Sequence, residues 1–167
     1  MLPTHSHIVY ALSINQFVYI SQNEKGVFQY YVFRNGEHVA VEAENSMRIE
    51  GMSHDSLIGW EEKDGLQQAI LLREGIKHTL PLPSQYNESA ATYIHENGYI
   101  LGYAMTKASE QRYAIMWVDR QPVDINRCVN SDYIIAEANN MNAHFDIAAS
   151  AYNKLDDRLH PVLLRPY

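Results

Sequence analysis

The chain has 167 residues, of which 46% are hydrophobic and 20% charged, a balance typical of one soluble globular domain. Its formal net charge of −7, without any Lys/Arg cluster, argues against nucleic acid and anionic membranes as partners. A single cysteine, Cys128, excludes an intrachain disulfide and a cysteine-based zinc site.

The N-terminal residues 1–7 carry no Lys or Arg before their apolar residues, so they do not resemble a signal peptide. No apolar run approaches the ~18 residues that a membrane-spanning helix needs. These features and the lone cysteine favour the cytoplasm, although a disulfide-free exported protein would share them.

Turn signals divide the chain into short apolar runs, a pattern typical of an all-β domain. The first two groups of runs span residues 11–14, 17–21 and 30–34, then 47–52, 56–60 and 69–73. Gly26 and Gly36 of the first group recur as Gly65 and Gly75 of the second, both displaced by 39 residues. Two glycines kept at one displacement indicate an internal repeat.

A third copy of the repeat covers residues 94–117, in which Gly102 and Ala114 match Gly59 and Ala69. The fourth copy is weaker, with residues 147–149 and 160–164 as its second and third runs. The first three copies add a short outer run, at residues 38–41, 77–80 and 122–125. One repeat-built domain over residues 1–167 is therefore expected, with repeats at approximately 6–44, 45–88, 89–132 and 133–167.

Four antiparallel β-meander repeats of about 40 residues predict a small or partial β-propeller. A four-stranded sheet cannot bury both faces alone, so neighbouring repeats must stack face to face. In this register Trp117 and Leu72 are equivalent, because each follows an alanine by three residues. Both are expected to be buried.

A polar residue follows the first run of each repeat. These residues are Asn15, Ser53, His95 and Asn142. Asn and Ser at this position can bond the backbone two residues further on and close a tight turn. This pattern favours a structural role for all four over a ligand-binding one.

The pattern Ile-Asn-x-x-Gly-x-Ile-x-Gly, followed by Ala-x-x-Trp-x-x-Gly, is similar to that of the HAF-repeat family of β-propeller-like repeats. That family is named for a His-Ala-Phe tripeptide, which His160-Pro161-Val162 and Tyr113-Ala114-Ile115 approach most nearly. Ser21 in the first copy and Ala149 in the fourth stand where glycine is expected. The resemblance implies a propeller-blade fold and supplies no catalytic residues.

Residues 136–157 allow two interpretations. Met141, Phe145, Ala148, Tyr152 and Leu155 recur at helical spacing, in a segment without Gly or Pro. In register with the other repeats, the same segment forms a strand, a turn and a strand. We expect the strands, because tertiary context overrides local propensity.

Catalytic and metal-binding signatures are absent from the sequence. The eight histidines are scattered and form no His-Glu-x-x-His motif, so no metal site is expected. The chain also lacks a Gly-x-Ser-x-Gly elbow and a glycine-rich phosphate loop. No cofactor is therefore expected.

The loops between the second and third strands of each repeat carry the candidate binding residues. They span residues 22–26, 61–65, 106–111 and 153–158, and propeller blades would gather them on one face, here called the loop face. The candidates on it are Lys25, Glu61, Lys63, Asp64, Lys107 and Lys154. The competing interpretation is that charged loops of this kind are simply solvated turns.

The sequence therefore favours a non-enzymatic interaction module that binds a protein or a glycan on the loop face. One alternative is a glycoside-hydrolase-like enzyme, which would need Glu61, Glu62 and Asp64 to share a pocket with Asp156 or Asp157. Another is a purely structural assembly partner.

Self-association is expected for two reasons. The fourth repeat lacks an outer strand, which would leave an unpaired edge. Four short blades also close into a disc only under strong curvature, whereas two copies would form one larger ring. The homodimer competes with a closed four-bladed monomer.

Overall fold

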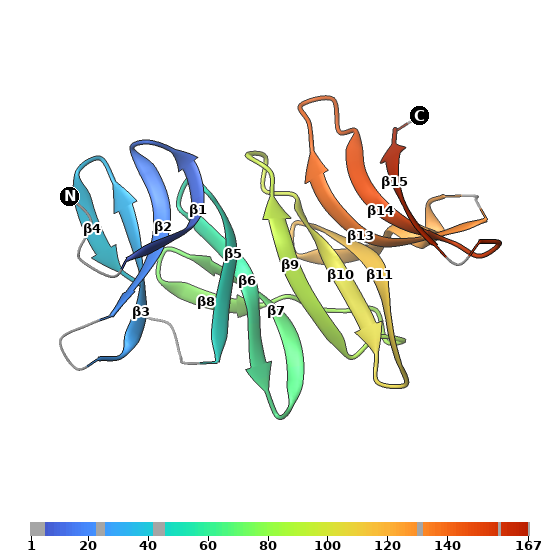
Figure 1. Ribbon diagram of the computed structural model, residues 1–167, viewed down its shortest axis with the longest axis horizontal. Coiled ribbons are helices and arrows are strands. Elements are labelled where there is room, and N and C mark those ends of the chain that lie inside the picture. The colour runs from blue at the N-terminus through green and yellow to red at the C-terminus, as the bar shows by residue number, and fades with distance from the viewer. Residues whose placement is uncertain (1–5, 23–25, 42–45, 130–131, 157, 167) are drawn as a thin grey trace.

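The protein is all-β over the residues that the computed structural model describes, which are 6–22, 26–41, 46–129, 132–156 and 158–166 (Figure 1). Its strands form four antiparallel sheets, and each sheet is a meander in chain order. Sheet 1 consists of β1 (His7–Ser13), β2 (Gln16–Gln22), β3 (Phe28–Arg34) and β4 (Glu37–Ala40). Sheet 2 consists of β5 (Met47–Ser53), β6 (Ser56–Lys63), β7 (Leu66–Arg73) and β8 (Ile76–Thr79). Sheet 3 consists of β9 (Glu88–Ile94), β10 (Ile100–Thr106), β11 (Ser109–Val118) and β12 (Gln121–Asp124), followed by the short 3-10 helix η1 (Ile125–Arg127). Sheet 4 consists of β13 (Tyr133–Met141), β14 (Ile147–Asn153) and β15 (Arg158–Leu164).

These sheets confirm the four predicted meanders and the three outer strands. They also confirm that the alanine-rich segment forms strands, because it contributes to β13 and β14 rather than to a helix. Its apparent helical stripe is divided by a turn, in which Asn142 Oδ1 accepts the backbone N–H groups of His144 and Asp146. No helix within the described ranges is long and apolar enough to cross a membrane.

The predicted bond from a polar side chain to the backbone is observed at Asn142, and a histidine makes the same bond at His95. Asn142 bonds the backbone two residues on, and His95 Nδ1 accepts the N–H of Asn97 at 3.2 Å. At Asn15 the arrangement is reversed, since the Asn15 backbone N–H donates to Ser13 Oγ. The structural role therefore holds for Asn142 and His95.

Each sheet packs its face against the next sheet, as the repeat requires. Three separate hydrophobic cores lie between sheets 1 and 2, between sheets 2 and 3, and between sheets 3 and 4. The side chains that meet in these cores include Val18 with Ile70, Leu71 with Trp117, and Leu101 with Ile147. The core of this protein is therefore distributed between its repeats.

The strand pairings confirm that Trp117 and Leu72 are equivalent. Leu72 pairs with Leu57 at the start of β6, and Trp117 pairs with Ile100 at the start of β10. Their exposed fractions are 7% and 0%. The indole of Trp117 also donates from Nε1 to the carbonyl oxygen of Pro81 at 2.7 Å, which ties sheet 3 to the segment after β8.

Sheets 1 and 4 lack the glycine that sheets 2 and 3 have at Gly59 and Gly102. The residue predicted to replace it is wrong for sheet 1 and correct for sheet 4. Gly59 of β6 pairs with Ile49 of β5 beside a bulge. In sheet 1 the residue that pairs beside the equivalent bulge is Tyr19, not Ser21. Ala149 holds that place in sheet 4. The connection between β2 and β3 is longer than the two-residue turn between β6 and β7, so the two repeats cannot be aligned by a single displacement.

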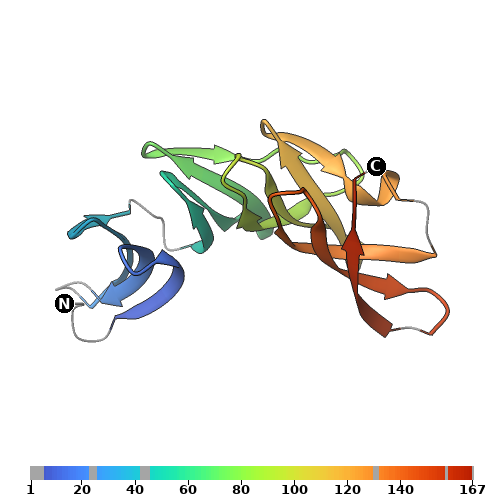
Figure 2. The same ribbon diagram turned by 90° about the horizontal axis from the view of Figure 1, so that it is seen from above.

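The four stacked sheets form an open arch rather than a closed disc. Viewed from above, sheets 1 and 4 stand at the two ends of the arch, and sheets 2 and 3 form its middle (Figure 2). This arrangement differs from the closed four-bladed alternative and corresponds to a partial propeller. The structure places the two ends of the stack apart, so the outer faces of sheets 1 and 4 do not meet.

Candidate functional site

The predicted loop-face residues lie at separate hairpins. Lys63 and Asp64 are exposed at the β6–β7 turn, and Lys107 is exposed at the β10–β11 turn, both at the lower edge of Figure 1. Lys154 is exposed in the β14–β15 connection of sheet 4. Lys25 lies outside the described residues. The four described lysine and aspartate side chains are therefore distributed over three hairpins of the arch.

Glu61 differs from the other candidates because it does not lie in a loop. It belongs to β6, is 4% exposed, and forms an ion pair with Lys77 of β8. Strand β6 continues to Lys63, and the tight turn is made by Asp64 and Gly65, which both have positive φ. Glu61 therefore stabilises sheet 2 and is turned away from a ligand on the loop face.

The carboxylates of the enzyme alternative are also dispersed. Glu61 is engaged with Lys77 in sheet 2, while Asp156 of sheet 4 bonds His160 Nε2 at 3.0 Å. Sheet 3 stands between these two sheets (Figure 1). Asp157, the other proposed partner, lies outside the described residues. Glu61 and Asp156 thus do not form the pair that retaining or inverting glycosidases need.

The opposite face of the arch carries a pocket of about 560 Å³ between sheets 2 and 3. We call this face the turn face, because it contains the β5–β6, β7–β8, β9–β10 and β11–β12 turns. The described residues that line the pocket are Ser53, His54, Asp55, Ser56, Leu71, Arg73, His78, Ile94, His95, Glu96, Asn97, Gly98, Ile100, Asp119 and Arg120. None of the predicted loop-face residues is among them.

Hydrogen bonds to the backbone position both walls of this pocket. On the sheet 2 side, the carbonyl oxygen of His54 accepts from Gln16 Nε2 at 2.7 Å and from the guanidinium of Arg34. On the sheet 3 side, the buried imidazole of His95 is fixed by the N–H of Asn97. The pocket is therefore largely preformed, as binding sites usually are.

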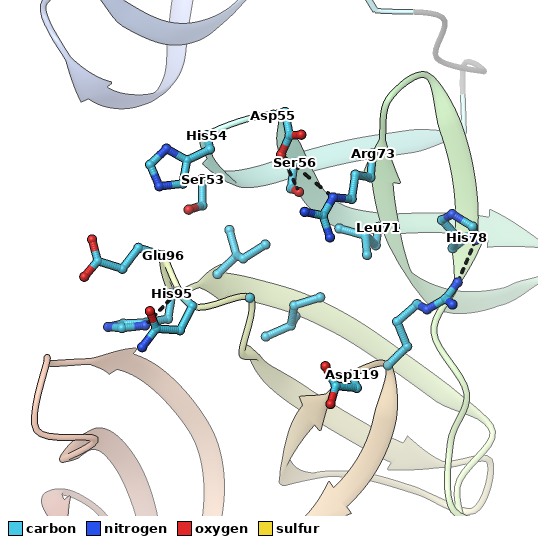
Figure 3. Close-up of a pocket in the computed structure, with 15 residues that line it drawn as sticks. Ser53, His54, Asp55, Ser56, Leu71, Arg73, His78, His95, Glu96 and Asp119 are labelled. Atoms are coloured by element: carbon cyan, nitrogen blue, oxygen red, sulfur yellow. Dashed lines mark hydrogen bonds and ion pairs between the residues drawn. The ribbon is translucent and has the colours of Figure 1, made fainter.

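Charged groups of both signs line the pocket over an apolar floor (Figure 3). Arg73 Nε lies 3.9 Å from Asp55 Oδ1, and Arg120 Nη1 lies 3.2 Å from His78 Nδ1. Both contacts are solvent-exposed and therefore weak, so a ligand can displace them. Among the residues that the structure describes, Glu96 and Asp119 have no ion-pair partner.

Three non-glycine residues of the pocket have a positive φ, namely His54 of the β5–β6 turn and both central residues of the β11–β12 turn. Asp119 and Arg120 have φ values of 49° and 64°, a left-handed conformation that costs a non-glycine residue about 1–2 kcal/mol. The equivalent turns of sheets 1 and 2 place glycine at the second position, as Gly36 and Gly75. Sheet 3 instead retains a long cationic side chain there, at a cost in stability.

A second pocket, of about 600 Å³, repeats this arrangement between sheets 1 and 2. Its described lining is mainly apolar and includes Val32, Val39, Val41, Leu57 and Leu72. The turn equivalent to Asp119-Arg120 is Glu74-Gly75 in this pocket, so the carboxylate is kept and the arginine is replaced by glycine. Charged side chains of both signs line both pockets, and the pocket between sheets 2 and 3 differs by its three histidines and by Arg120.

The described part of the chain contains no group of three or more His, Cys, Asp or Glu side chains that could hold a metal ion. The three pocket histidines come from separate strands and turns. His95 uses Nδ1 as an acceptor for a backbone N–H, so its Nε2 carries the proton and can donate to a ligand.

Sequence reasoning did not identify this pocket, although one signal for it was present. The third repeat has Asp119-Arg120 where the first two have Asn35-Gly36 and Glu74-Gly75. A non-glycine residue at a turn position that takes glycine in the other repeats is a signal of a functional side chain. The convergence of the turns across two sheets requires knowledge of how the sheets stack.

No family model matches the chain, and no curated protein sequence matches it. The resemblance to HAF repeats therefore stays a prediction. Among solved structures, the chain is similar to "putative TolB" from Agrobacterium tumefaciens, with a TM-score of 0.55 and 11% identity over 90% of this chain. The chain spans 62% of the length of that structure. At this identity the likeness shows the fold alone, a β-propeller-like stack of antiparallel sheets.

Proposed function

We propose that this protein is a non-enzymatic interaction module that binds a segment of a partner protein in the pocket between sheets 2 and 3. The observation that carries the proposal is the convergence, over an apolar floor, of two arginines and two carboxylates that have no ion-pair partner among the described residues. These groups are Arg73, Arg120, Glu96 and Asp119, and the floor is formed by Leu71, Ile94 and Ile100. A peptide with both signs of charge and an apolar side chain matches this lining.

The lining favours a protein over a glycan. Sugars are commonly bound against aromatic rings, and the described lining contains no Trp, Tyr or Phe. The hydrogen-bond donors and acceptors of the lining come from charged side chains and from the backbone of four turns. Such turns suit the recognition of an extended peptide, whose own backbone and charged side chains need partners.

The conformation of Arg120 supports a binding role for this turn. Residues held in sparsely populated backbone conformations cluster at functional sites, where the surrounding structure maintains them. Arg120 lies at a position that takes glycine in sheets 1 and 2, and its guanidinium reaches the pocket. Arginine is also enriched at the centres of protein interfaces.

An enzyme is the less supported alternative. General acid–base catalysis needs a group positioned for proton transfer and free to make it. The best-buried candidates are engaged in structural contacts, since Glu61 pairs with Lys77 and His95 Nδ1 accepts a backbone N–H. The loop-face residues Lys63, Asp64, Lys107 and Lys154 stay a predicted second surface and provide a matched control.

Affinity capture with charge-reversal variants tests the proposal. The immobilised chain is incubated with an extract of the cells that produce it, and captured proteins are quantified by mass spectrometry. One variant carries Arg73→Glu and Arg120→Glu in the pocket. A control with the same change in net charge carries Lys63→Glu and Lys107→Glu on the loop face. We expect capture of the specific partner to fall at least about tenfold for the pocket variant alone.

Two outcomes would contradict this account. Loss of the partner in the loop-face variant, with capture intact in the pocket variant, would place binding on the predicted loop face. Failure of the wild-type chain to enrich any protein over the pocket variant would remove the support for an interaction module. Circular dichroism and thermal unfolding of each variant establish that the fold is retained.

A stability measurement tests whether the Asp119-Arg120 turn is retained for binding. Arg120→Gly is expected to raise the free energy of unfolding by about 1 kcal/mol, because glycine adopts positive φ without the steric cost. The same change is expected to weaken partner capture. Urea unfolding measures the first effect.

The reciprocal variant Gly75→Arg is the control for this measurement. Gly75 has a φ of 76° at the equivalent turn, with no atom within 4 Å of the added Cβ. Its replacement should therefore lose about 1 kcal/mol from backbone strain alone. A loss of stability in Arg120→Gly would show that the arginine serves the fold rather than a ligand.

A further inference from the structure

In sheets 2, 3 and 4, three side chains on one face pack back toward the preceding sheet. In sheet 2 these are Leu57, Ile70 and Leu72, which lie in the core shared with sheet 1. The strand pairings place Ile100, Ile115 and Trp117 at the same positions in sheet 3, and Ile147, Val162 and Leu164 in sheet 4. In sheet 1 the same positions hold Phe17, Tyr31 and Phe33. We call this set the rear face.

A second set of three packs forward, against the following sheet. Val18, Tyr30 and Val32 of sheet 1 face sheet 2, and Ile58, Ala69 and Leu71 of sheet 2 face sheet 3. Leu101, Ala114 and Met116 of sheet 3 face sheet 4. The equivalent residues in sheet 4 are Ala148, Pro161 and Leu163. We call this set the forward face.

Every junction in the stack joins a forward face to a rear face, and the arch leaves one of each unmatched. The rear face of sheet 1 is aromatic, with the rings of Phe17 and Phe33 stacked at 4.7 Å and only partly buried. The forward face of sheet 4 exposes Leu163 at 52%, and Leu159, further along the same face of β15, is exposed at 64%. Both faces are apolar surfaces of the type that is buried at the other three junctions.

We propose that a second copy of this chain covers both faces, so that two arches close head to tail into one ring of eight sheets. In that ring, the forward face of sheet 4 packs on the rear face of sheet 1 of the second copy. The contact continues the forward-to-rear packing already seen at three junctions. A second copy presents both of the faces that this arch leaves uncovered.

The geometry of the arch favours two copies. Sheets 1 and 4 stand at the two ends of the arch in Figure 2, on its open side. A two-fold axis through the open side brings each free forward face to a free rear face, so both junctions are identical and no apolar face remains. The resulting ring needs no pairing of strand edges between copies. This inference does not depend on the binding pocket, which lies within one copy.

Light scattering of the 167-residue chain at micromolar concentration tests the inference. The wild-type chain is expected at twice its 19.2 kDa mass. Leu163→Asp is expected to weaken the dimer at least about tenfold, because it places a charge in an apolar junction. Phe33→Lys tests the other side of the same junction. The control is Leu155→Asp, which makes an equal chemical change in a turn where leucine is 85% exposed, and it should leave the dimer intact.

Mixing the two variants tests the head-to-tail arrangement. A copy with Leu163→Asp retains its rear face, and a copy with Phe33→Lys retains its forward face, so one unaltered junction forms between them. We expect the mixture to recover part of the dimer that each variant alone has lost. A wild-type monomer across a dilution series would overturn the inference. So would a mass that grows beyond two copies, or a dimer unaffected by both variants.

Discussion

Replacing Trp117 by alanine is expected to lower the free energy of unfolding by about 3–5 kcal/mol. The indole is fully buried in the core between sheets 2 and 3, and its Nε1 donates to the carbonyl oxygen of Pro81. The substitution removes a large apolar group from a junction on which two sheets depend. It also leaves a carbonyl oxygen without its donor.

Leu72→Ala tests the equivalent position one repeat earlier, and a loss of about 2–5 kcal/mol is expected. Urea unfolding gives both values, and Trp117→Phe separates the packing of the ring from its hydrogen bond. Leu155→Ala serves as the exposed control. If both buried positions lost less than about 0.5 kcal/mol, the repeat register on which the stack is built would be wrong.

Replacing Gly102 or Gly59 by alanine is expected to be at least as damaging. A Cβ at Gly102 would lie 2.0 Å from the carbonyl oxygen of Ala90, and one at Gly59 would lie 1.8 Å from that of Arg48. Both obstacles are backbone atoms of the neighbouring strand, so no side-chain rotation relieves them. We expect a loss above about 4 kcal/mol, or failure to fold.

Gly51→Ala is the matched control for these two substitutions. Its added Cβ would meet Ile58 Cδ1 at 3.1 Å, which is the end of a flexible side chain that can move. We therefore expect a much smaller change in the thermal midpoint. If Gly59→Ala or Gly102→Ala unfolded at the wild-type temperature, the close approach of the first two strands in sheets 2 and 3 would be disproved.

The sequence predicts the strands of this protein well, because their signals are local. Gly65 and Gly75 mark turns that require positive φ, and both are observed in that conformation. Trp117 follows its alanine in a register that the pairing confirms. Even the ambiguous segment around Ala148 could be assigned by comparison with the other repeats.

The candidate site could not be predicted in the same way, because it depends on how sheets stack. Glu61 looks like a loop residue in sequence, but β6 extends past it and Lys77 of β8 takes up its charge. Arg73, Glu96 and Arg120 are distant in sequence and meet only across the junction of sheets 2 and 3. Local patterns do not encode the angle at which two sheets meet.

Hydrogen exchange of the chain, alone and in complex with its captured partner, tests the proposed site most directly. We expect slower exchange at residues 53–56, 94–98 and 119–120, which are the turns around the pocket. The hairpins at residues 63–66 and 106–109 should exchange at the same rate in both samples. Protection of those hairpins, with unchanged exchange at the three turns, would contradict the account and place the partner on the loop face.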